Sequence, residues 1–234
     1  MLKIVFVSFV LLATLISPPA QATERSVDEI KRDIVAMAKS FTGQGDPDFA
    51  IQNQLDVLVE ELLAVAPPQP PASERIDLLV GPWKQLWGQY DYTGGDDRGV
   101  DPRLGVEDIY QVVFPGGYYY NVSPYEGRRF DFIALLRGQY TFVEGYPDMI
   151  KGKFTDFPGS KSVPEGVELW ELAEMAENEE LPDRTTVVPS WIVWLFFGSG
   201  YLREAYTDDT MRLIYGGDEL DDRDNEYLYV LVRP

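Results

Sequence analysis

The chain has 234 residues and contains neither cysteine nor histidine. Without cysteine there is no disulfide and no thiol nucleophile. Without histidine there is no Ser-His-Asp or Cys-His arrangement, and the commonest zinc ligand is missing. Carboxylates, lysine or tyrosine can still carry acid–base chemistry. An enzyme is nevertheless less expected, because the histidine- and cysteine-dependent mechanisms are excluded. We predict a protein with no catalytic residues and no metal site.

Basic residues are also scarce, since 20 Lys and Arg stand against 39 Asp and Glu, for a formal net charge of −19 at pH 7. A surface of this sign repels nucleic acid and anionic lipid. We therefore predict no nucleic-acid partner and no strong binding to anionic membranes.

Long apolar runs are few, and the longest lies at the N-terminus. Lys3 precedes residues 4–16, which are apolar except at two positions, and the small-x-small triplet 20–22 follows. A basic start, an apolar core and an A-x-A end are typical of a Sec-type signal peptide, and the run is too short for a good membrane span. We predict a signal peptide over residues 1–22 and export of the mature chain. The alternative is an uncleaved N-terminal anchor.

Residues 23–66 favour a helical hairpin. The positions at helical spacing are Ile30, Ile34, Met37, Ala38 and Phe41 in a first helix, and Ile51, Leu55, Leu58 and Leu62 in a second. Pro47 suits the first position of the second helix. A proline-rich link over residues 67–77 then ends the hairpin.

From residue 78 the chain changes to short segments rich in aromatic and branched side chains. They cover residues 83–92, 108–114, 118–125, 129–144 and 149–157, and three more lie between residues 201 and 232. Turn signals separate them, so we predict an antiparallel sheet that closes as a barrel or a sandwich. A strongly acidic segment, about 164–180, favours a surface helix packed over one mouth of a barrel.

Several short motifs stand in a fixed order along these segments. A G-x-W motif opens the first strand, a Q-x-V strand and an Asn-Val strand follow, and "GYLREAYTDDTMRLIYGG" forms a late hairpin. The signature positions are Gly81, Trp83, Gln111, Asn121, Tyr206, Asp208, Arg212 and Gly216. With the helix pair and the proline link, this order resembles the plastid lipid-associated protein (PAP)/fibrillin family over about residues 27–216. The G-x-W motif also resembles the opening motif of lipocalins.

The resemblance implies a lipocalin-like antiparallel β-barrel over residues 78–234. It implies that the barrel binds a hydrophobic small molecule (a lipid, quinone or carotenoid) and is associated with photosynthetic membranes. No catalytic residue belongs to the family pattern. In such barrels the Trp closes one end and an Arg from a late strand packs over it, for which Arg233 and Arg212 are the candidates. A signal peptide in place of a plastid transit peptide points to the thylakoid lumen or periplasm of a cyanobacterium-like cell.

The predicted ligand contacts are aromatic and apolar side chains at alternate strand positions, which point to one face of a strand. They are Trp83, Trp87, Tyr110, Val112, Phe114, Phe130 and Phe132. An apolar cavity lined in this way suits a hydrophobic ligand. The alternative is that these side chains simply fill the barrel, as in many small barrels. Trp83 in particular can close the barrel without touching a ligand.

Seven consecutive apolar residues, 191–197, include Trp191, Trp194, Phe196 and Phe197. They can belong to the core or plug one end of the barrel. The functional alternative is contact with a membrane or a partner protein, since exposed patches of this size are rare and usually mark an interface. With a filled barrel, this second hypothesis makes the protein an assembly or interaction factor of a thylakoid or periplasmic membrane complex.

Two acidic stretches invite a chemical interpretation. Asp208 and Asp209 are adjacent, but they lie between two strand-like segments, where Asp typically bonds the amides of its own turn. We predict a hairpin there, in which Arg212 pairs with Asp208 or covers an aromatic ring. The loop 218–226 lacks the spacing of a calcium loop and is predicted to be a solvated hairpin tip.

Overall fold

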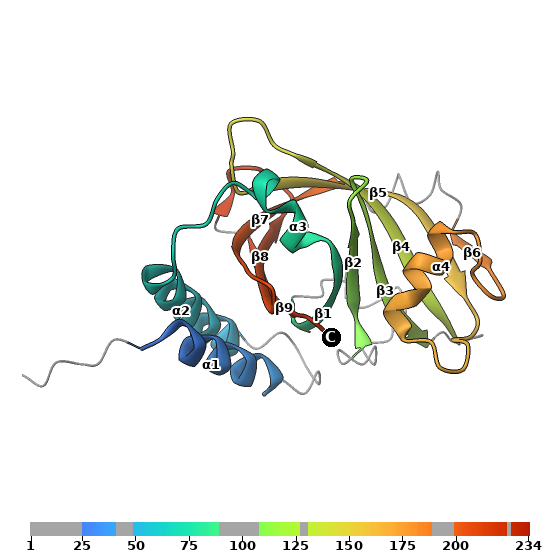
Figure 1. The fold of residues 1–234 in the computed structure, drawn as a ribbon, viewed down its shortest axis with the longest axis horizontal. Helices are drawn as coiled ribbons and strands as arrows, with labels where there is room; N and C mark the ends of the chain where they lie inside the picture. The colour runs from blue at the N-terminus through green and yellow to red at the C-terminus, as the bar shows by residue number, and fades with distance from the viewer. Residues whose placement is uncertain (1–24, 41–48, 89–107, 127–130, 189–198, 224–225) are drawn as a thin grey trace, which may run out of the picture.

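The computed structural model describes residues 25–40, 49–88, 108–126, 131–188, 199–223 and 226–234 (Figure 1). The helices are α1 (Val27–Lys39), α2 (Phe49–Val65), η1 (Ala72–Arg75), α3 (Ile76–Leu79), η3 (Leu169–Glu171) and α4 (Leu172–Glu177). The strands are β1 (Gly81–Trp87), β2 (Tyr110–Phe114), β3 (Tyr118–Glu126), β4 (Asp131–Phe142), β5 (Met149–Ser160), β6 (Thr185–Val188), β7 (Ser199–Thr207), β8 (Met211–Gly217) and β9 (Tyr227–Val232).

The strands form one antiparallel sheet in the order β4-β3-β2-β1-β9-β8-β7-β5-β6. Because β4 also pairs with β5, eight of these strands close into a ring, and β6 pairs with the far end of β5. The prediction of a mainly β chain behind an N-terminal helix pair is confirmed.

The helix pair covers the outer face of one side of the ring (Figure 1). Helix α1 begins at a capping box, in which Ser26 and Glu29 each accept a hydrogen bond from the other's backbone amide. The buried residues that the two helices share with β8 and β9 are Ile30, Ile34, Ala38, Leu55, Val59, Leu62, Met211, Leu213, Leu228 and Val230. None of the described helices is both long enough and apolar enough to cross a bilayer.

Helix α4 packs on another part of the outer face, over β2 and β3 (Figure 1). Its buried side chains Leu172, Ala173 and Ala176 belong to one cluster with Tyr110, Val112, Tyr120, Val122 and Leu135. Glu177 fixes the end of the helix, since it pairs with Arg137 and accepts a hydrogen bond from the Tyr120 hydroxyl at 2.9 Å. The predicted helix therefore lies on the wall of the ring rather than over its mouth, because its apolar face matches the apolar outer face of β2 and β3.

Candidate functional site

The inside of the ring holds a separate apolar cluster. Its members are Ala72, Leu79, Trp83, Val113, Tyr119, Ile150, Ile214 and Leu231, with Ile76, Tyr140, Phe154, Leu202 and Tyr229 packed against them. They come from η1, α3 and every strand of the ring, so this cluster is the place where a ligand inside the ring would have to bind.

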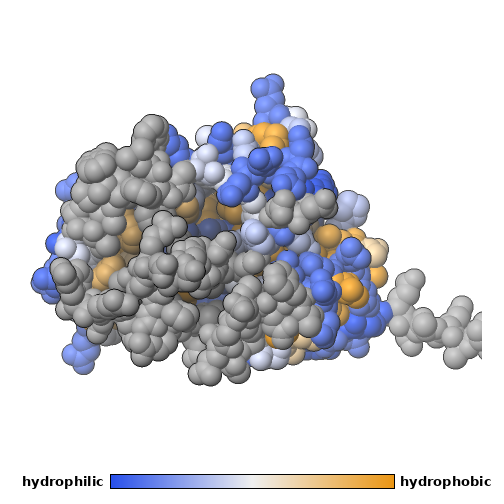
Figure 2. Space-filling model, turned by 180° about the vertical axis from the view of Figure 1, so that it is seen from behind, coloured by the Kyte–Doolittle hydropathy of each residue, from blue (hydrophilic) through white to orange (hydrophobic). Residues whose placement is uncertain are grey.

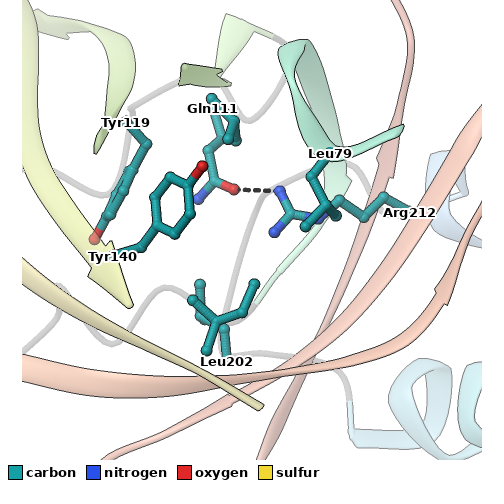
Figure 3. A pocket seen from close by; sticks show the side chains of 8 residues that line it. Leu79, Gln111, Tyr119, Tyr140, Leu202 and Arg212 are labelled. Atoms are coloured by element: carbon teal, nitrogen blue, oxygen red, sulfur yellow. Dashed lines mark hydrogen bonds between the residues drawn. The ribbon is translucent and has the colours of Figure 1, made fainter. Parts of the chain in front are cut away.

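Between these side chains lies a cavity with a water-accessible volume of about 10 Å³. It is lined by Leu79, Gln111, Val113, Tyr119, Tyr140, Ile150, Leu202 and Arg212, most of which Figure 3 shows converging on one space. Such a volume holds about one water molecule, whereas small-molecule sites usually measure roughly 300–1,000 Å³. At this cavity the interior is packed.

Tyrosine rings lying on glycines explain much of this packing. A Cβ atom at Gly138 would lie 2.6 Å from Tyr119 Cε1, and one at Gly152 would lie 3.0 Å from the Tyr119 hydroxyl oxygen. Tyr229 lies in the same way on Gly216, where a Cβ would be 2.8 Å from its Cε2 atom. The glycines thus leave recesses in the wall, and the aromatic rings occupy them.

A buried polar network borders the cavity. The Arg212 guanidinium donates through Nε to both carboxylate oxygens of Glu204, at 3.2 and 3.0 Å, and its Nη2 also donates to Glu204. Both side chains are at most 3% exposed. Arg212 Nη1 donates to Gln111 Oε1 at 2.6 Å (Figure 3). Gln111 Nε2 in turn donates to Asn121 Oδ1 at 3.3 Å. The predicted pairing of Arg212 with Asp208 is therefore wrong, since Glu204 is its carboxylate partner.

A second buried arginine lies beside this pair. Arg75 Nη2 donates to the backbone carbonyl of Glu204 at 3.3 Å, and its Nη1 donates to Gln69 at 2.9 Å. Burial lowers the pKa of Arg75, partly offset by the Glu204 charge. The single carboxylate of Glu204 therefore compensates much of the charge of this part of the core.

Trp83 lies where η1 and α3 join the interior cluster, and this part of the ring is called the closed end below. The Arg233 guanidinium lies 3.7 Å from the centroid of the Trp83 ring and donates to the carbonyls of Leu78, Val80 and Pro82. The indole Nε1 donates to the Leu79 carbonyl at 2.8 Å. Arg233, and not Arg212, is the arginine over the indole. Gly81 is required beneath it, because its φ is +107° and a Cβ there would approach Arg233 Nη1 to 2.8 Å.

The predicted ligand contacts are distributed over both faces of the sheet. Trp83 is inside the ring, but Tyr110, Val112 and Phe114 pack on the outer face beneath η3 and α4. Trp87 packs outside as well, beneath the helix pair, because a register shift between Gln85 and Trp87 interrupts the alternation of β1. Phe132 is buried on β4 and by alternation shares the face of Tyr140. Phe130, Trp191, Trp194, Phe196 and Phe197 lie outside the described residues.

The signature positions fall into two groups. Gly81, Trp83, Gln111, Asn121, Arg212 and Gly216 belong to the interior or its closed end. Tyr206 and Asp208 belong to the β7–β8 hairpin, where Asp208 Oδ1 accepts hydrogen bonds from the amides of Thr210 and Met211, both at 2.8 Å. Asp208 Oδ2 accepts from the Tyr206 hydroxyl and pairs with Lys31 of α1. Asp208 is thus fully engaged in shaping the turn and docking α1, as expected for the turn.

This arrangement predicts an acid-sensitive contribution to stability. Burial would raise the pKa of Asp208, but the hydrogen bonds from Lys31, Thr210, Tyr206 and Met211 outweigh it and lower the pKa from 3.8 to about 2. A carboxyl whose pKa is lower in the folded state stabilises above the unfolded pKa, and this stabilisation is lost as the pH falls from about 4 to about 2.

Asp208→Asn is therefore expected to lower the unfolding free energy at pH 7 by about 1 kcal/mol, a value discounted for partial exposure. The variant should also lose less stability than the wild type between pH 4 and pH 2.5, measured by urea denaturation. The neighbouring Asp209 is exposed, so Asp209→Asn is the matched control. An identical acid slope in the wild type and Asp208→Asn would contradict the assignment.

Among the residues that the structure describes, no group of three or more acidic side chains is placed to hold a metal ion. Comparison with models of known protein families, with curated proteins and with solved structures gives no match. A functional assignment therefore depends on the geometry of the ring and on the resemblance of the short motifs.

Proposed function

We propose that this protein is an exported, non-catalytic barrel of the lipocalin-like PAP/fibrillin type, which acts by contacting a protein of a thylakoid or periplasmic membrane complex. The observation that carries the proposal is the close packing of the described interior side chains, which leave a cavity of only about 10 Å³ between them. A lipid, quinone or carotenoid needs far more space than one water molecule. The ring is accordingly better suited as a rigid scaffold than as a preformed container.

The lipocalin-like assignment is supported by the closed end of the ring. An eight-stranded antiparallel ring in which Trp83 is covered by Arg233 has the arrangement that the resemblance implies. The partner contact is proposed for Trp191, Trp194, Phe196 and Phe197, which lie outside the described residues. On the face in Figure 2, the described residues show hydrophilic surface with hydrophobic patches between them.

Two measurements test this function on the mature chain, residues 23–234. Mass spectrometry of an organic extract of the purified protein is expected to find no stoichiometric lipid or pigment. Changing Trp194→Ser and Phe197→Ser together is expected to reduce capture of the membrane complex at least about tenfold, as loss of aromatic anchors does. Phe142→Ser is the matched control, because Phe142 is 38% exposed on the β4–β5 hairpin. A stoichiometric co-purifying ligand would overturn the scaffold function.

A second candidate function is binding of a hydrophobic small molecule inside the ring. It is favoured by the composition of the cavity wall, in which two polar residues, Gln111 and Arg212, face apolar and aromatic side chains. This is the pattern of a small-molecule site.

A further inference from the structure

The side-chain amide nitrogen of Gln85, in the wall of the ring, lacks a hydrogen-bond partner. Gln85 is only 8% exposed, and its amide nitrogen Nε2 is buried and makes no hydrogen bond. Buried donors are almost always paired, because an unpaired donor has lost its bonds to water without replacement. A leucine would fill nearly the same space at this position without an unpaired donor, so the amide needs an explanation.

Gln85 points into the ring. It lies two residues after Trp83 on β1, and in the register of β1 and β9 it is opposite Leu231, which like Trp83 belongs to the interior cluster. Its amide lies against Gly88, since a Cβ at Gly88 would overlap Gln85 Nε2 and would approach Tyr229 Cδ1 to 2.6 Å. The unpaired nitrogen therefore lies beside an aromatic ring at the interior wall.

The neighbouring groups define which acceptor suits this nitrogen. Gln85 on β1 and Arg212 on β8 both lie opposite Leu231 of β9. The positive charge of Arg212 is already paired with Glu204. The Gln85 amide itself is neutral, and it presents its donor beside hydrocarbon and aromatic surface. A neutral carbonyl oxygen on an apolar molecule matches this amide better than a carboxylate, because a neutral donor does not offset the cost of burying a charge.

We infer that Gln85 is a hydrogen-bond donor for the carbonyl oxygen of an apolar ligand inside the ring. The inference rests on the second of the two proposed functions and names the chemistry of its ligand. Gln85 Nε2 donates to the ligand's carbonyl oxygen, while Tyr229 and Leu231 contact the adjoining hydrocarbon. Gly88 is part of the site, because a side chain there would occupy the space beside the amide.

The test compares two probes that differ in the carbonyl group, 2-nonanone and nonane, by titration of the tryptophan fluorescence of residues 23–234. The wild type is expected to bind the ketone about tenfold more tightly than the alkane, the effect of one neutral hydrogen bond. Gln85→Leu should abolish this preference without lowering the thermal midpoint. The matched control is Gln139→Leu, because Gln139 is an exposed glutamine on β4, and it should keep the preference.

The other outcomes separate the inference from the function beneath it. Equal binding of the two probes by the wild type overturns the role of Gln85 but leaves a hydrophobic site in the ring. Binding of neither probe overturns both the inference and the second candidate function, and leaves the scaffold function untouched. A lower thermal midpoint for Gln85→Leu with an unchanged ketone preference assigns Gln85 a structural role and also overturns the inference.

Discussion

Replacing Glu204 by leucine is expected to lower the unfolding free energy by about 3–5 kcal/mol, the range found when one partner of a buried ion pair is removed. The Glu204 side chain is 0% exposed and that of Arg212 is 3% exposed, so Arg212 would remain charged in the core without a carboxylate. Arg75, which is 3% exposed, would lose the same compensating charge. Urea denaturation at pH 7, monitored by tryptophan fluorescence, measures the change.

A double variant distinguishes the lost pairing from a general loss of packing. Glu204→Leu combined with Arg212→Met replaces the pair by apolar side chains, and such replacements are often close to neutral. The double variant is therefore expected to be more stable than Glu204→Leu alone. The single variant Arg212→Met completes the comparison. If the losses of unfolding free energy in Glu204→Leu and Arg212→Met simply add up to that of the double variant, Glu204 does not hold the charge balance of this core. The same conclusion follows if Glu204→Leu lowers the unfolding free energy by less than about 1 kcal/mol.

The β7–β8 hairpin was predictable because its signals are local. Strand-like residues flank Asp208, and the carboxylate bonds the amides of Thr210 and Met211, two and three residues further along the chain. The N-terminal helix pair was predictable for the same reason, since the spacing of Ile30 and Ile34 lies within one helix. These features depend on neighbours in sequence, which is the information that a single sequence contains.

The faces of the strands were harder to predict, because several strands are buried on both sides. On β2 the alternation separates Tyr110 and Val112 from Gln111 and Val113, but it does not say which pair faces the ring. The more apolar pair lies outside, since α4 covers it, and Gln111 lies inside, where it meets Arg212. The register shift before Trp87 likewise depends on the pairing of β1 with β9.

The packed interior depends on contacts between distant segments. Glu204 and Tyr119 were not recognised as site residues, because nothing near them in sequence marks a buried carboxylate or a ring that fills a recess. Tyr119 lies on Gly138 and Gly152 only because β3, β4 and β5 pair in one register. The unpaired amide of Gln85 is also visible only in the folded chain. The signal available in the sequence for this packing was glycine inside a strand, because it indicates that another group approaches the backbone closely there.

Trp83→Ala is expected to lower the unfolding free energy by about 3–5 kcal/mol, the usual cost of deleting a buried aromatic side chain. Trp83 is 0% exposed and joins α3, the interior cluster and Arg233. Its removal leaves a cavity at the closed end, takes away the donor to the Leu79 carbonyl and uncovers the Arg233 guanidinium. Urea denaturation of the mature chain measures the change.

The conservative variant Trp83→Phe keeps an aromatic ring beneath Arg233 but loses the indole N–H. It is therefore expected to lower the unfolding free energy by about 1–2 kcal/mol. Trp170 on η3 is only partly buried, and Trp170→Ala is the control for loss of a tryptophan near the surface. Equal effects of Trp83→Ala and Trp170→Ala would show that Trp83 does not close the ring. If Trp83→Phe folds and still captures the membrane complex, Trp83 supports the scaffold without contacting the partner, as its position beneath Arg233 implies.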